Sequence, residues 1–570
     1  MDYRSEYEKW LASPALTAEE RAELEAIRED DKEVKERFYA PLEFGTAGLR
    51  GTMKMGLHQM NRFVINWATQ GFADVIAAEG EEAKARGVAV CMDSRNHGYE
   101  YAQAAACVMA ANGIKVLLFD ALRPTPELSF AVREYGCIAG INVTASHNPK
   151  AYNGYKVYWE GGAQLPTHMA DKVAAKMAHI DPLAPRMECD NPAPLTWLES
   201  DFDRLYIDAV LKCAIAPELM ADQGDDLKII YSAFHGVGGY IVPEVLHRAG
   251  AQNLIPVPEQ LWPDGTFPTV ASPNPEDPAG FAMAIQLAKE HDADFCVGTD
   301  PDSDRVGIVV RDKAGNYVPV SGNRTGALLL HYMLTMGEKK GLLPEHPALI
   351  KTIVTSSLPQ IIAEDHGAIC RNTFTGFKNM AEEVARLEQE GKYHFVLAYE
   401  ESYGYMIGDH ARDKDGVVGA LLLCEMAAWY RSRGMTVLDG LDELFARYGA
   451  FGEMTRSVML PGQDGMERMA AIMAALRKAP LTAINGIGVK AWRDYGCGKR
   501  YAGDAVTDME LKGSNVVFYE LETGENLVIR PSGTEPKIKI YALMQGVSME
   551  QADARAAACA LAAEQAILAI

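Results

Sequence analysis

Basic residues are scarce in this chain relative to acidic ones. Of its 570 residues, 55 are Lys or Arg and 78 are Asp or Glu, which gives a formal net charge of −23. Such an acidic chain is a poor non-specific binder of nucleic acid or of anionic membranes, so neither is expected as a partner. An anionic substrate would need a local cluster of Arg and Lys that acts against the global field.

Long apolar runs are absent as well. No run approaches the roughly 20 residues needed to span a bilayer, and the polar, acidic start from Met1 to Glu6 is unlike a signal peptide. The ten cysteines include no C-x-x-C pair and are too sparse for a disulfide scaffold, which is typical of reduced thiols. We therefore expect a cytoplasmic protein.

Nucleotide-binding motifs are missing too. The chain contains no G-x-x-x-x-G-K-[ST] loop, and residues 486–491 fit G-x-G-x-x-A without a convincing helix after them. The remaining composition, with 48% hydrophobic and 23% charged residues, is that of an ordinary folded protein. At about 100–200 residues per domain, the length indicates three to five domains, with four the central expectation.

Short apolar strands alternate with helical patterns after residue 87. Residues 2–40 read as helices, and Thr17 with Glu20 forms a capping-box pattern. Repeated βα units predict α/β domains with largely parallel sheets. The predicted strands are 88–92, 115–119, 137–143, 227–231, 294–298, 348–354 and 394–398.

Three segments interrupt the alternation of strands and helices. Three glycines within residues 44–51 predict a shaped loop that presents Arg50. The Pro-rich segment 181–194 is typical of a connection between domains. The region from about 496 onward reads as hairpin-like strands followed by a packing helix over 549–570.

The loop after the strand ending at residue 143 contains a candidate nucleophile. Residues 144–149 read Thr-Ala-Ser-His-Asn-Pro, and the loop is expected to continue through Lys156. A serine hydroxyl is a weak nucleophile that needs a base or a cation beside it. His147 next to Ser146 fits that need, while the alternative is a turn whose polar residues bond their own backbone.

A second loop contains three carboxylates at alternate positions, namely Asp300, Asp302 and Asp304. Carboxylates at this spacing repel one another unless a cation lies between them, and hard oxygen ligands suit Mg²⁺ or Ca²⁺. The loop is not an EF-hand, because Arg305 and Arg311 occupy the positions that require Gly and Glu. The alternative is a solvated acidic turn.

Two more loops have residues suited to sugar phosphates. Glu400 and Ser402 follow a predicted strand, where a carboxylate and a hydroxyl can bond sugar hydroxyls. Residues 530–537 combine Arg, two hydroxyls and Gly, which suits a phosphate cradle. Taken alone, the Glu400 loop is equally consistent with a polar loop, and the alternative for residues 530–537 is a Pro-Gly turn with incidental charges.

Together, these motifs resemble the α-D-phosphohexomutase superfamily, and specifically its phosphoglucomutase branch. The resemblance covers nearly the whole chain and includes Gly-Leu-Arg-Gly at 48–51 and the segment 412–416, which is similar to the long branch of bacterial phosphoglucomutases and phosphopentomutases. It implies three related α/β domains with mixed, mostly parallel sheets and a C-terminal α+β domain around a central cleft. The implied domains are 1–204, 205–321, 322–448 and 449–570.

The resemblance also implies roles for individual residues. Ser146 matches the phosphorylated serine, and an oxygen of its phosphate joins the three aspartates as a ligand of Mg²⁺. The implied catalytic residues are Ser146, His147, Lys156, Arg50 and Arg305, with Lys156 favoured as the general base if its pKa is lowered. The implied substrate-binding residues are Gly376, Lys378, Glu400, Ser402, Lys414, Arg530, Ser532, Gly533 and Thr534.

The implied reaction interconverts glucose 1-phosphate and glucose 6-phosphate through a phosphoserine and glucose 1,6-bisphosphate, in a monomer or weak homo-oligomer. Tyr399, where many relatives have Gly, leaves a pentose or mannose phosphate open as the substrate. A haloacid-dehalogenase-type enzyme with Asp300 as nucleophile and Asp302 as acid/base would need Thr or Val at position 304, where Asp304 stands. A non-catalytic relative would have lost the serine or an aspartate, and both motifs are intact.

Overall fold

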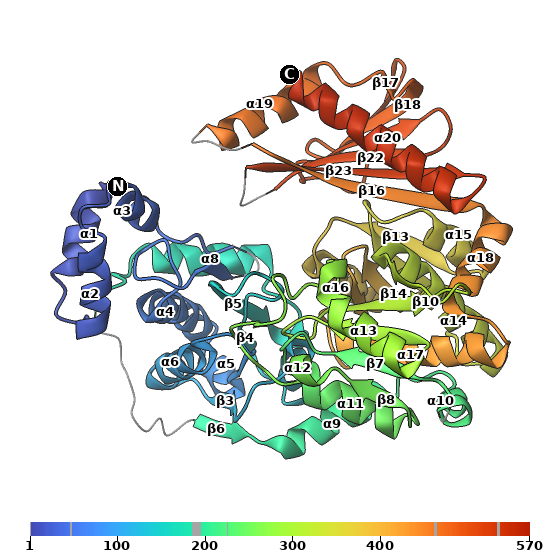
Figure 1. The fold of residues 1–570 in the computed structure, drawn as a ribbon. Coiled ribbons are helices and arrows are strands. Elements are labelled where there is room, and N and C mark those ends of the chain that lie inside the picture. The colour runs from blue at the N-terminus through green and yellow to red at the C-terminus, as the bar shows by residue number, and fades with distance from the viewer. Residues whose placement is uncertain (1, 46–47, 185–194, 225, 461–463, 533–535) are drawn as a thin grey trace. The chain divides into compact units, whose positions relative to one another are not determined.

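The computed structural model describes residues 2–45, 48–184, 195–224, 226–460, 464–532 and 536–570 (Figure 1). The chain divides into two compact units. The first comprises residues 1–345 and 376–437, and the second comprises residues 346–375 and 438–570. Among the described residues, no helix combines the length and the apolar character that crossing a bilayer requires.

The first sheet of unit 1 is mixed, with the strand order β1-β5-β4-β2-β3-β6. β2, β3, β4 and β6 are parallel, whereas β5 and β1 run antiparallel at one edge. β2 and β4 are buried along their whole length, as expected for strands covered on both faces. The strands are β1 Leu49–Thr52, β2 Val88–Met92, β3 Val116–Phe119, β4 Ala139–Val143, β5 Tyr152–Trp159 and β6 Leu195–Leu198. The helices of this part are α1 Tyr3–Leu11, α2 Ala18–Ala26, α3 Asp31–Phe38, α4 Arg62–Ala78, α5 Glu81–Arg86, α6 Gly98–Ala111, α7 Thr125–Glu134 and α8 Thr167–Met177.

Two segments expected as loops are strands instead. Arg50 lies in β1 and pairs antiparallel with Gly154 of β5, which also contains Lys156. The glycines that indicate turns here allow close approach of backbones: an added Cβ at Gly48, whose φ is +84°, would lie 1.8 Å from the Tyr155 carbonyl oxygen. The expectation of a loop over 44–51 was therefore wrong for residues 49–51, because pairing with a distant strand overrides local glycine content.

The second sheet of unit 1 has the strand order β11-β10-β9-β7-β8. β9, β7 and β8 are parallel, and β10 and β11 continue the sheet as antiparallel hairpin strands. The turn between β9 and β10 is the aspartate-rich loop. The strands are β7 Ile229–Ser232, β8 Leu254–Pro256, β9 Phe295–Thr299, β10 Val306–Arg311 and β11 Tyr317–Val320. The helices are α9 Ser200–Leu211, α10 Pro217–Gln223, α11 Gly238–Arg248, α12 Pro258–Leu261, α13 Ala282–His291 and α14 Gly322–Lys340.

The rest of unit 1 is an antiparallel strand pair with two helices. β14 spans His394–Glu400 and pairs with β15 at Gly404–Met406. α16 spans Phe377–Glu390, and the almost wholly buried α17 spans Gly416–Ser432. The turn between β14 and β15 is the predicted sugar-reading loop.

Unit 2 is built around an antiparallel sheet with the order β16-β23-β22-β21-β18-β19-β20. Alternate residues of β21 belong to different cores: Val517 and Tyr519 pack with α19 and α20, whereas Phe518 packs with Ile353 and Val354. The sheet is therefore covered on both faces. Its strands are β16 Ala450–Met459, β17 Ala483–Ile484, β18 Ile487–Asp494, β19 Lys499–Ala502, β20 Ala505–Asp508, β21 Val517–Leu521, β22 Asn526–Pro531 and β23 Lys537–Gly546. The unit also contains the parallel pair β12 Pro347–Thr352 and β13 Ile369–Thr373, with helices α15 Leu358–Asp365, α18 Val437–Tyr448, α19 Gly465–Lys478 and α20 Met549–Leu568.

Most element predictions are confirmed. Each of the seven predicted strands lies within two residues of a strand at either end, and the capping box at Thr17 and Glu20 is present. The segment 487–494 is a strand rather than a helix, which agrees with the rejection of a dinucleotide loop. Most of the predicted connection over 181–194 lies outside the described residues.

Candidate active site

Two loops bring the candidate serine against the candidate cation ligands. Ser146 follows β4, and Asp300 directly follows β9, so both lie where strands of parallel sheets end. Ser146 Oγ donates a hydrogen bond of 2.8 Å to Asp300 Oδ2 across 154 residues of sequence. Both side chains are buried. The two strongest motifs in the sequence therefore form one site.

The backbone around Ser146 is strained and tightly held. Its φ is +51°, a left-handed conformation that is uncommon for a residue with a side chain and is enriched at functional sites. Its N–H donates to Thr144 Oγ1 at 2.8 Å. The buried guanidinium of Arg95 donates to the carbonyl oxygens of Ser146 and Asn148. These contacts fix the position of the hydroxyl.

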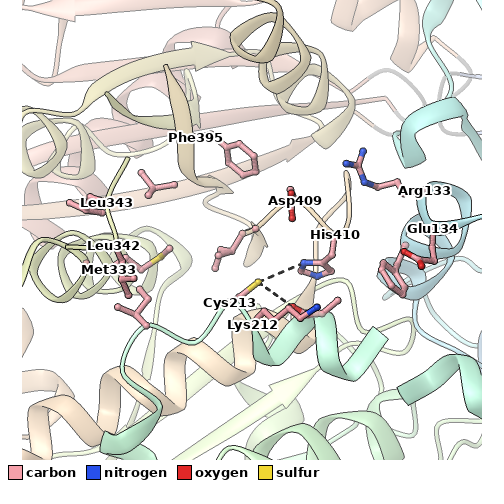
Figure 2. A pocket seen from close by; sticks show the side chains of 17 residues that line it. Arg133, Glu134, Lys212, Cys213, Met333, Leu342, Leu343, Phe395, Asp409 and His410 are labelled. Atoms are coloured by element: carbon pink, nitrogen blue, oxygen red, sulfur yellow. Dashed lines mark hydrogen bonds between the residues drawn. The ribbon is translucent and has the colours of Figure 1, made fainter. Parts of the chain in front are cut away.

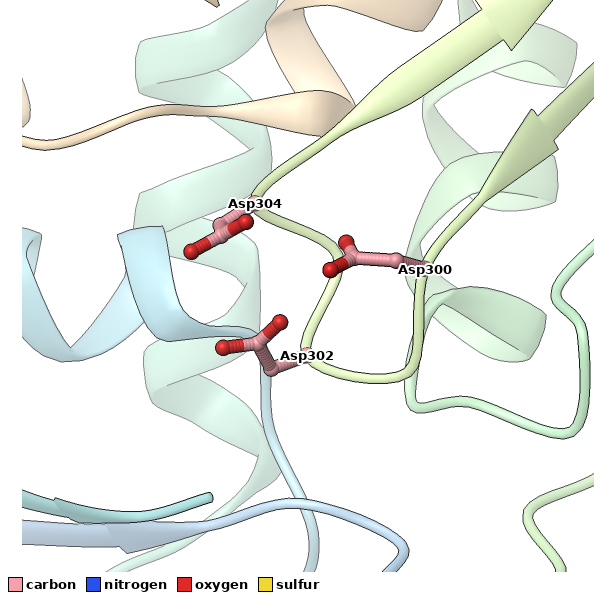
Figure 3. A group of neighbouring side chains, drawn as sticks. All are labelled: Asp300, Asp302 and Asp304. Carbon is pink, nitrogen blue, oxygen red and sulfur yellow. The ribbon is translucent and has the colours of Figure 1, made fainter. Parts of the chain in front are cut away.

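The three aspartates are arranged as a cation site (Figure 3). One carboxylate oxygen from each of Asp300, Asp302 and Asp304 lies within 4.8 Å of the others, and all three residues are buried. Within the described part of the chain, Asp302 Oδ1 and Asp304 Oδ1 are buried without a hydrogen-bond partner. Unpartnered buried carboxylate oxygens are costly, and a hard divalent cation would satisfy them. The residues present therefore fit a divalent metal.

Two lysines face the same carboxylates. Lys156 Nζ lies 2.6 Å from Asp302 Oδ2 and 3.0 Å from Asp304 Oδ2, and Lys414 Nζ lies 3.1 Å from Asp304 Oδ2. Burial alone would lower the pKa of both lysines, but the adjacent carboxylates outweigh burial and raise it. Burial, followed by the charges of Asp302 and Asp304, raises the pKa of Asp300 well above its usual value. Because their pKa values are raised, Lys156 and Lys414 are both protonated.

His147, unlike the two protonated lysines, is a neutral side chain in this site. Its Nδ1 lies 3.2 Å from Ser146 Oγ. Burial, followed by the nearby charge of Arg305, lowers the pKa of His147 well below 6.5. The imidazole is therefore neutral at physiological pH and is able to accept a proton beside the serine.

The predicted arginines lie on either side of these groups. Arg50 Nη1 donates to Asn148 Oδ1 at 3.2 Å, so β1 places it beside the Ser146 loop. Arg305 Nη1 donates to the Ser402 carbonyl oxygen at 3.1 Å and to Glu276 at 2.9 Å. Arg305 thus links the aspartate loop to the turn between β14 and β15.

The predicted sugar-reading residues form a second cluster in the same unit. Glu400 ends β14, and one of its carboxylate oxygens accepts a hydrogen bond from the Gly376 N–H. Ser402 Oγ lies 3.4 Å from the other oxygen of Glu400. Lys378 donates to Thr167 at a more exposed position. The Glu400 carboxylate and the Ser402 hydroxyl therefore lie in the turn that Arg305 contacts.

The predicted phosphate cradle belongs to unit 2. Arg530 lies near the end of β22, and the Ser532 N–H donates to the Lys537 carbonyl oxygen at 2.7 Å. Gly533 and Thr534 lie outside the described residues. The role of this loop stays a prediction.

Known proteins match this chain over most of its length. Family models of phosphoglucomutase/phosphomannomutase α/β/α domains I, II and III match residues 41–184, 204–315 and 321–448. A phosphoglucomutase of Staphylococcus epidermidis is 36% identical over 523 residues, covering 90% of this chain and 92% of the relative. The chain belongs to the phosphoglucomutase/phosphomannomutase family. A phosphoglucomutase of Staphylococcus aureus is 35% identical over 518 residues, covering 90% of this chain and 91% of that one.

Solved structures of the phosphoglucomutase/phosphomannomutase family share the fold. A putative phosphomannomutase from Thermus thermophilus aligns with a TM-score of 0.69 at 22% identity, covering 93% of this chain and 99% of that one. The phosphoglucomutase parafusin from Paramecium, in an open form, aligns at 0.68 with 18% identity over 93% and 95% of the two chains. The expected three α/β domains with mixed sheets and a C-terminal α+β domain are confirmed, and the C-terminal domain is rich in β-strands. Like its relatives, the chain is a phosphosugar mutase.

Several residues that shape this family site were not predicted as site residues. Arg95 follows β2, and Thr125, the first residue of α7, donates from its Oγ1 to Asp302 Oδ2 at 2.8 Å. Asp413 accepts a hydrogen bond from Tyr158 at 2.8 Å and pairs with Lys414. Their position after strands was the available signal, because polar residues there face the site of an α/β fold.

Proposed function

We propose that this mutase interconverts glucose 1-phosphate and glucose 6-phosphate through a phosphorylated Ser146 and a glucose 1,6-bisphosphate intermediate. The observation that carries the proposal is the 2.8 Å hydrogen bond from Ser146 Oγ to Asp300 within the buried carboxylate trio. The staphylococcal relatives named phosphoglucomutase support glucose as the sugar. A phosphopentomutase or phosphomannomutase is the alternative.

We propose Mg²⁺ as the cation, held by Asp300, Asp302 and Asp304 and by a phosphate oxygen on Ser146. The unpartnered oxygens of the described site and their hard-ligand chemistry support this choice. A bound Mg²⁺ would offset negative charge on the transferred phosphoryl group.

Phosphoryl transfer then needs positive charge and a proton acceptor. The bond between phosphorus and Ser146 Oγ breaks while a sugar hydroxyl oxygen bonds to phosphorus, and the hydroxyl proton moves to a base. Arg305, Lys156 and Lys414 would neutralise the oxygens of the group in transit. In the second half of the cycle, the other phosphate of glucose 1,6-bisphosphate returns to Ser146.

We assign the base to His147 rather than to Lys156. Lys156 needs a lowered pKa to accept a proton, and its neighbours Asp302 and Asp304 raise it instead. His147 is neutral, and its Nδ1 lies 3.2 Å from Ser146 Oγ, next to the position of the phosphoryl group that the sugar hydroxyl would attack. A base must lie within hydrogen-bond reach of the proton it takes.

The substrate-binding roles are assigned to residues of the two loops that the sequence suggests for sugar and phosphate. We propose that Glu400, Ser402, Gly376 and Lys378 read the sugar. We further propose that the loop of unit 2 grips the phosphate that is not being transferred, through Arg530, Ser532, Gly533 and Thr534. One cradle must serve both ends of the sugar, which requires the bisphosphate to turn over between the two half-reactions.

Larger-scale features complete the proposal. We propose four domains at 1–204, 205–321, 322–448 and 449–570, which meet at a central cleft, in a cytoplasmic monomer or weak homo-oligomer. No nucleic acid or membrane partner is proposed. The excess of acidic over basic residues is the reason that neither partner is proposed.

The function is tested with Ser146→Ala and the wild-type enzyme. We expect wild type to carry a phosphate on Ser146 by intact mass and peptide mapping, and to convert glucose 1-phosphate in the presence of catalytic glucose 1,6-bisphosphate. We expect Ser146→Ala to remain folded and to lose turnover. A phosphate on Asp300, or an active Ser146→Ala enzyme, would contradict the proposal.

A second experiment decides which sugar is the substrate. It compares kcat/KM for glucose, mannose and ribose 1-phosphates.

A further inference from the structure

A cysteine, a histidine and an aspartate form a chain of contacts away from the aspartate trio. Cys213 follows α9, and its Sγ lies 3.7 Å from His410 Nδ1 (Figure 2). His410 Nε2 lies 2.8 Å from Asp415 Oδ2, and the hydroxyl of Tyr206 donates to the same carboxylate at 3.0 Å. The proposed mutase reaction uses none of these groups.

The sulfur of Cys213 lies at a cavity of about 580 Å³. Figure 2 shows Cys213 and His410 at its wall, together with charged side chains such as Lys212 and apolar ones such as Met333 and Phe395. Gly408 leaves little room beside the sulfur, because an added Cβ there would lie 2.6 Å from Sγ. Cys213 is partly exposed, so a small reagent has access to it through the cavity.

His410 carries a positive charge toward this sulfur. Burial alone would lower the pKa of His410, but its hydrogen bond to Asp415, with a smaller contribution from Cys213, raises the pKa to about 10. The imidazolium therefore donates its Nδ1–H to Sγ at neutral pH. Cysteines beside a protonated imidazole are reactive because the thiolate is the nucleophilic form.

Cys497 provides a natural contrast within the chain. It is more exposed than Cys213, but its sulfur lies 3.4 Å from the carboxylate Oδ2 of Asp494. A neighbouring anion disfavours a thiolate, whereas a neighbouring cation favours it. Exposure and electrostatics therefore make opposite predictions about which of the two thiols reacts first.

We propose that Cys213 is a site of reversible oxidation by peroxides, and that its oxidation slows the mutase. The sulfur lone pair attacks one oxygen of the peroxide, a sulfur–oxygen bond forms and the oxygen–oxygen bond breaks. The sulfur loses two electrons to the peroxide, the departing hydroxide takes a proton from His410 to leave as water, and His410 regains a proton from the Cys213 thiol. The product is a sulfenic acid, which thiols reduce back.

The His410–Asp415 pair connects this thiol to the active site. Asp415 caps α17 by accepting hydrogen bonds from the N–H groups of Val417 and Val418. On either side of it, Lys414 pairs with Asp304, and the Gly416 N–H donates to the Ser303 carbonyl oxygen at 2.9 Å. Oxidation adds an oxygen atom to Sγ, which lies against His410 Nδ1 and next to Gly408, where there is little room. The added atom displaces His410 from Asp415 and so disturbs the loop that places Lys414.

The labelling test uses the full chain, limiting hydrogen peroxide and a dimedone-type trap for sulfenic acids, followed by peptide mapping. We expect Cys213 to be trapped about tenfold faster than Cys497, in spite of its lower exposure. His410→Gln should remove most of that advantage, while Cys497→Ser should leave it unchanged. Faster labelling of Cys497 in wild type would overturn the proposal without reliance on any variant.

The activity test rests on the proposed function, whereas the labelling test does not. A failure of the proposed mutase function can therefore be told apart from a failure of the oxidation proposal. We expect peroxide to lower mutase turnover severalfold in wild type and dithiothreitol to restore it. Cys213→Ser should keep basal turnover and resist peroxide. Equal loss of turnover in wild type and Cys213→Ser would overturn the link between oxidation and activity.

Discussion

At the scale of single residues, the site concentrates features that cost stability. Ser146 and Ser303 both have positive φ values, +51° and +53°, on the two facing loops. In the described part of the site, Ser303 Oγ and one oxygen each of Asp302 and Asp304 are buried without partners. Strained backbone and unpaired polar atoms persist where surrounding structure holds them, and they are common at functional sites.

Ser303→Gly should stabilise the free enzyme by about 1 kcal/mol, because Gly adopts positive φ without strain and lacks the unpaired hydroxyl. Urea denaturation in the absence of metal measures the free energy of unfolding. Ser303→Ala is the matched control, because it removes the hydroxyl but keeps the strained backbone. A Gly variant less stable than the Ala variant would contradict a role for backbone strain.

Removal of the cation should abolish turnover. We expect excess EDTA to inactivate the enzyme and added Mg²⁺ to restore it, since hard carboxylate ligands favour that ion. Asp302→Asn removes a ligand charge and should lower kcat by about 100-fold or more. A steady-state assay across Mg²⁺ concentrations measures both effects. Full activity in EDTA would show that the carboxylate trio does not act through a metal.

At the scale of secondary-structure elements, buried charges join helices to loops. Glu425 of α17 accepts hydrogen bonds from the N–H groups of Ile215 and Ala216, at 2.9 and 3.0 Å, and from the hydroxyl of Tyr332 in α14. Burial raises the pKa of Glu425. This one carboxylate therefore satisfies the start of α10 and ties it to two long helices.

Glu425→Leu should lower the free energy of unfolding by about 3 kcal/mol, because it leaves buried N–H and O–H donors without an acceptor. Glu425→Gln keeps an acceptor oxygen in place and should cost about 1 kcal/mol. Urea denaturation at neutral pH compares the two variants. Equal stabilities would show that side-chain volume, rather than hydrogen bonding, matters at this position.

The His410–Asp415 pair should make stability depend on pH. The pKa of His410 is raised from 6.5 to about 10, so its contribution is fully present below pH 6.5 and is lost as the pH rises through 10. The stability difference between wild type and His410→Gln should therefore shrink across that range. Denaturation at several pH values measures this difference, and the same comparison in Cys213→Ser separates the thiol from the imidazole. A constant difference would contradict a protonated His410.

Local and distant features differ in how well the sequence predicts them. The Asp300–Asp304 trio was predictable as a candidate cation site, because three carboxylates at alternate positions repel one another unless a cation lies between them. The contacts of Lys156 with Asp302 and of Lys414 with Asp304 join residues far apart in sequence, and no local pattern indicates them. β1 was mistaken for a loop for the same reason, since its glycines serve pairing with a strand about 100 residues away.

At the scale of the whole molecule, the chain forms two units with separate cores. Leu527 is fully buried in the core of unit 2, and Leu118 is nearly so in that of unit 1. Separate cores in a long chain favour unfolding in more than one step.

Leu527→Ala should lower the stability of unit 2 by about 3 kcal/mol through a cavity in its core. Differential scanning calorimetry should show one transition shifted downward and another unchanged. Leu118→Ala is the matched control and should shift the other transition. A single transition that moves equally in both variants would show that the two units unfold together.

The strand order of unit 2 has a consequence for synthesis on the ribosome. β16 pairs along its whole length with β23, which begins at Lys537, long after β16 ends at Met459. At a translation rate of about 5–20 residues per second, the nascent β16 waits roughly 4 to 16 seconds for its partner. During that interval an unpaired strand edge is available to other chains, so chaperones that bind exposed strands should matter most for this late part of the polypeptide.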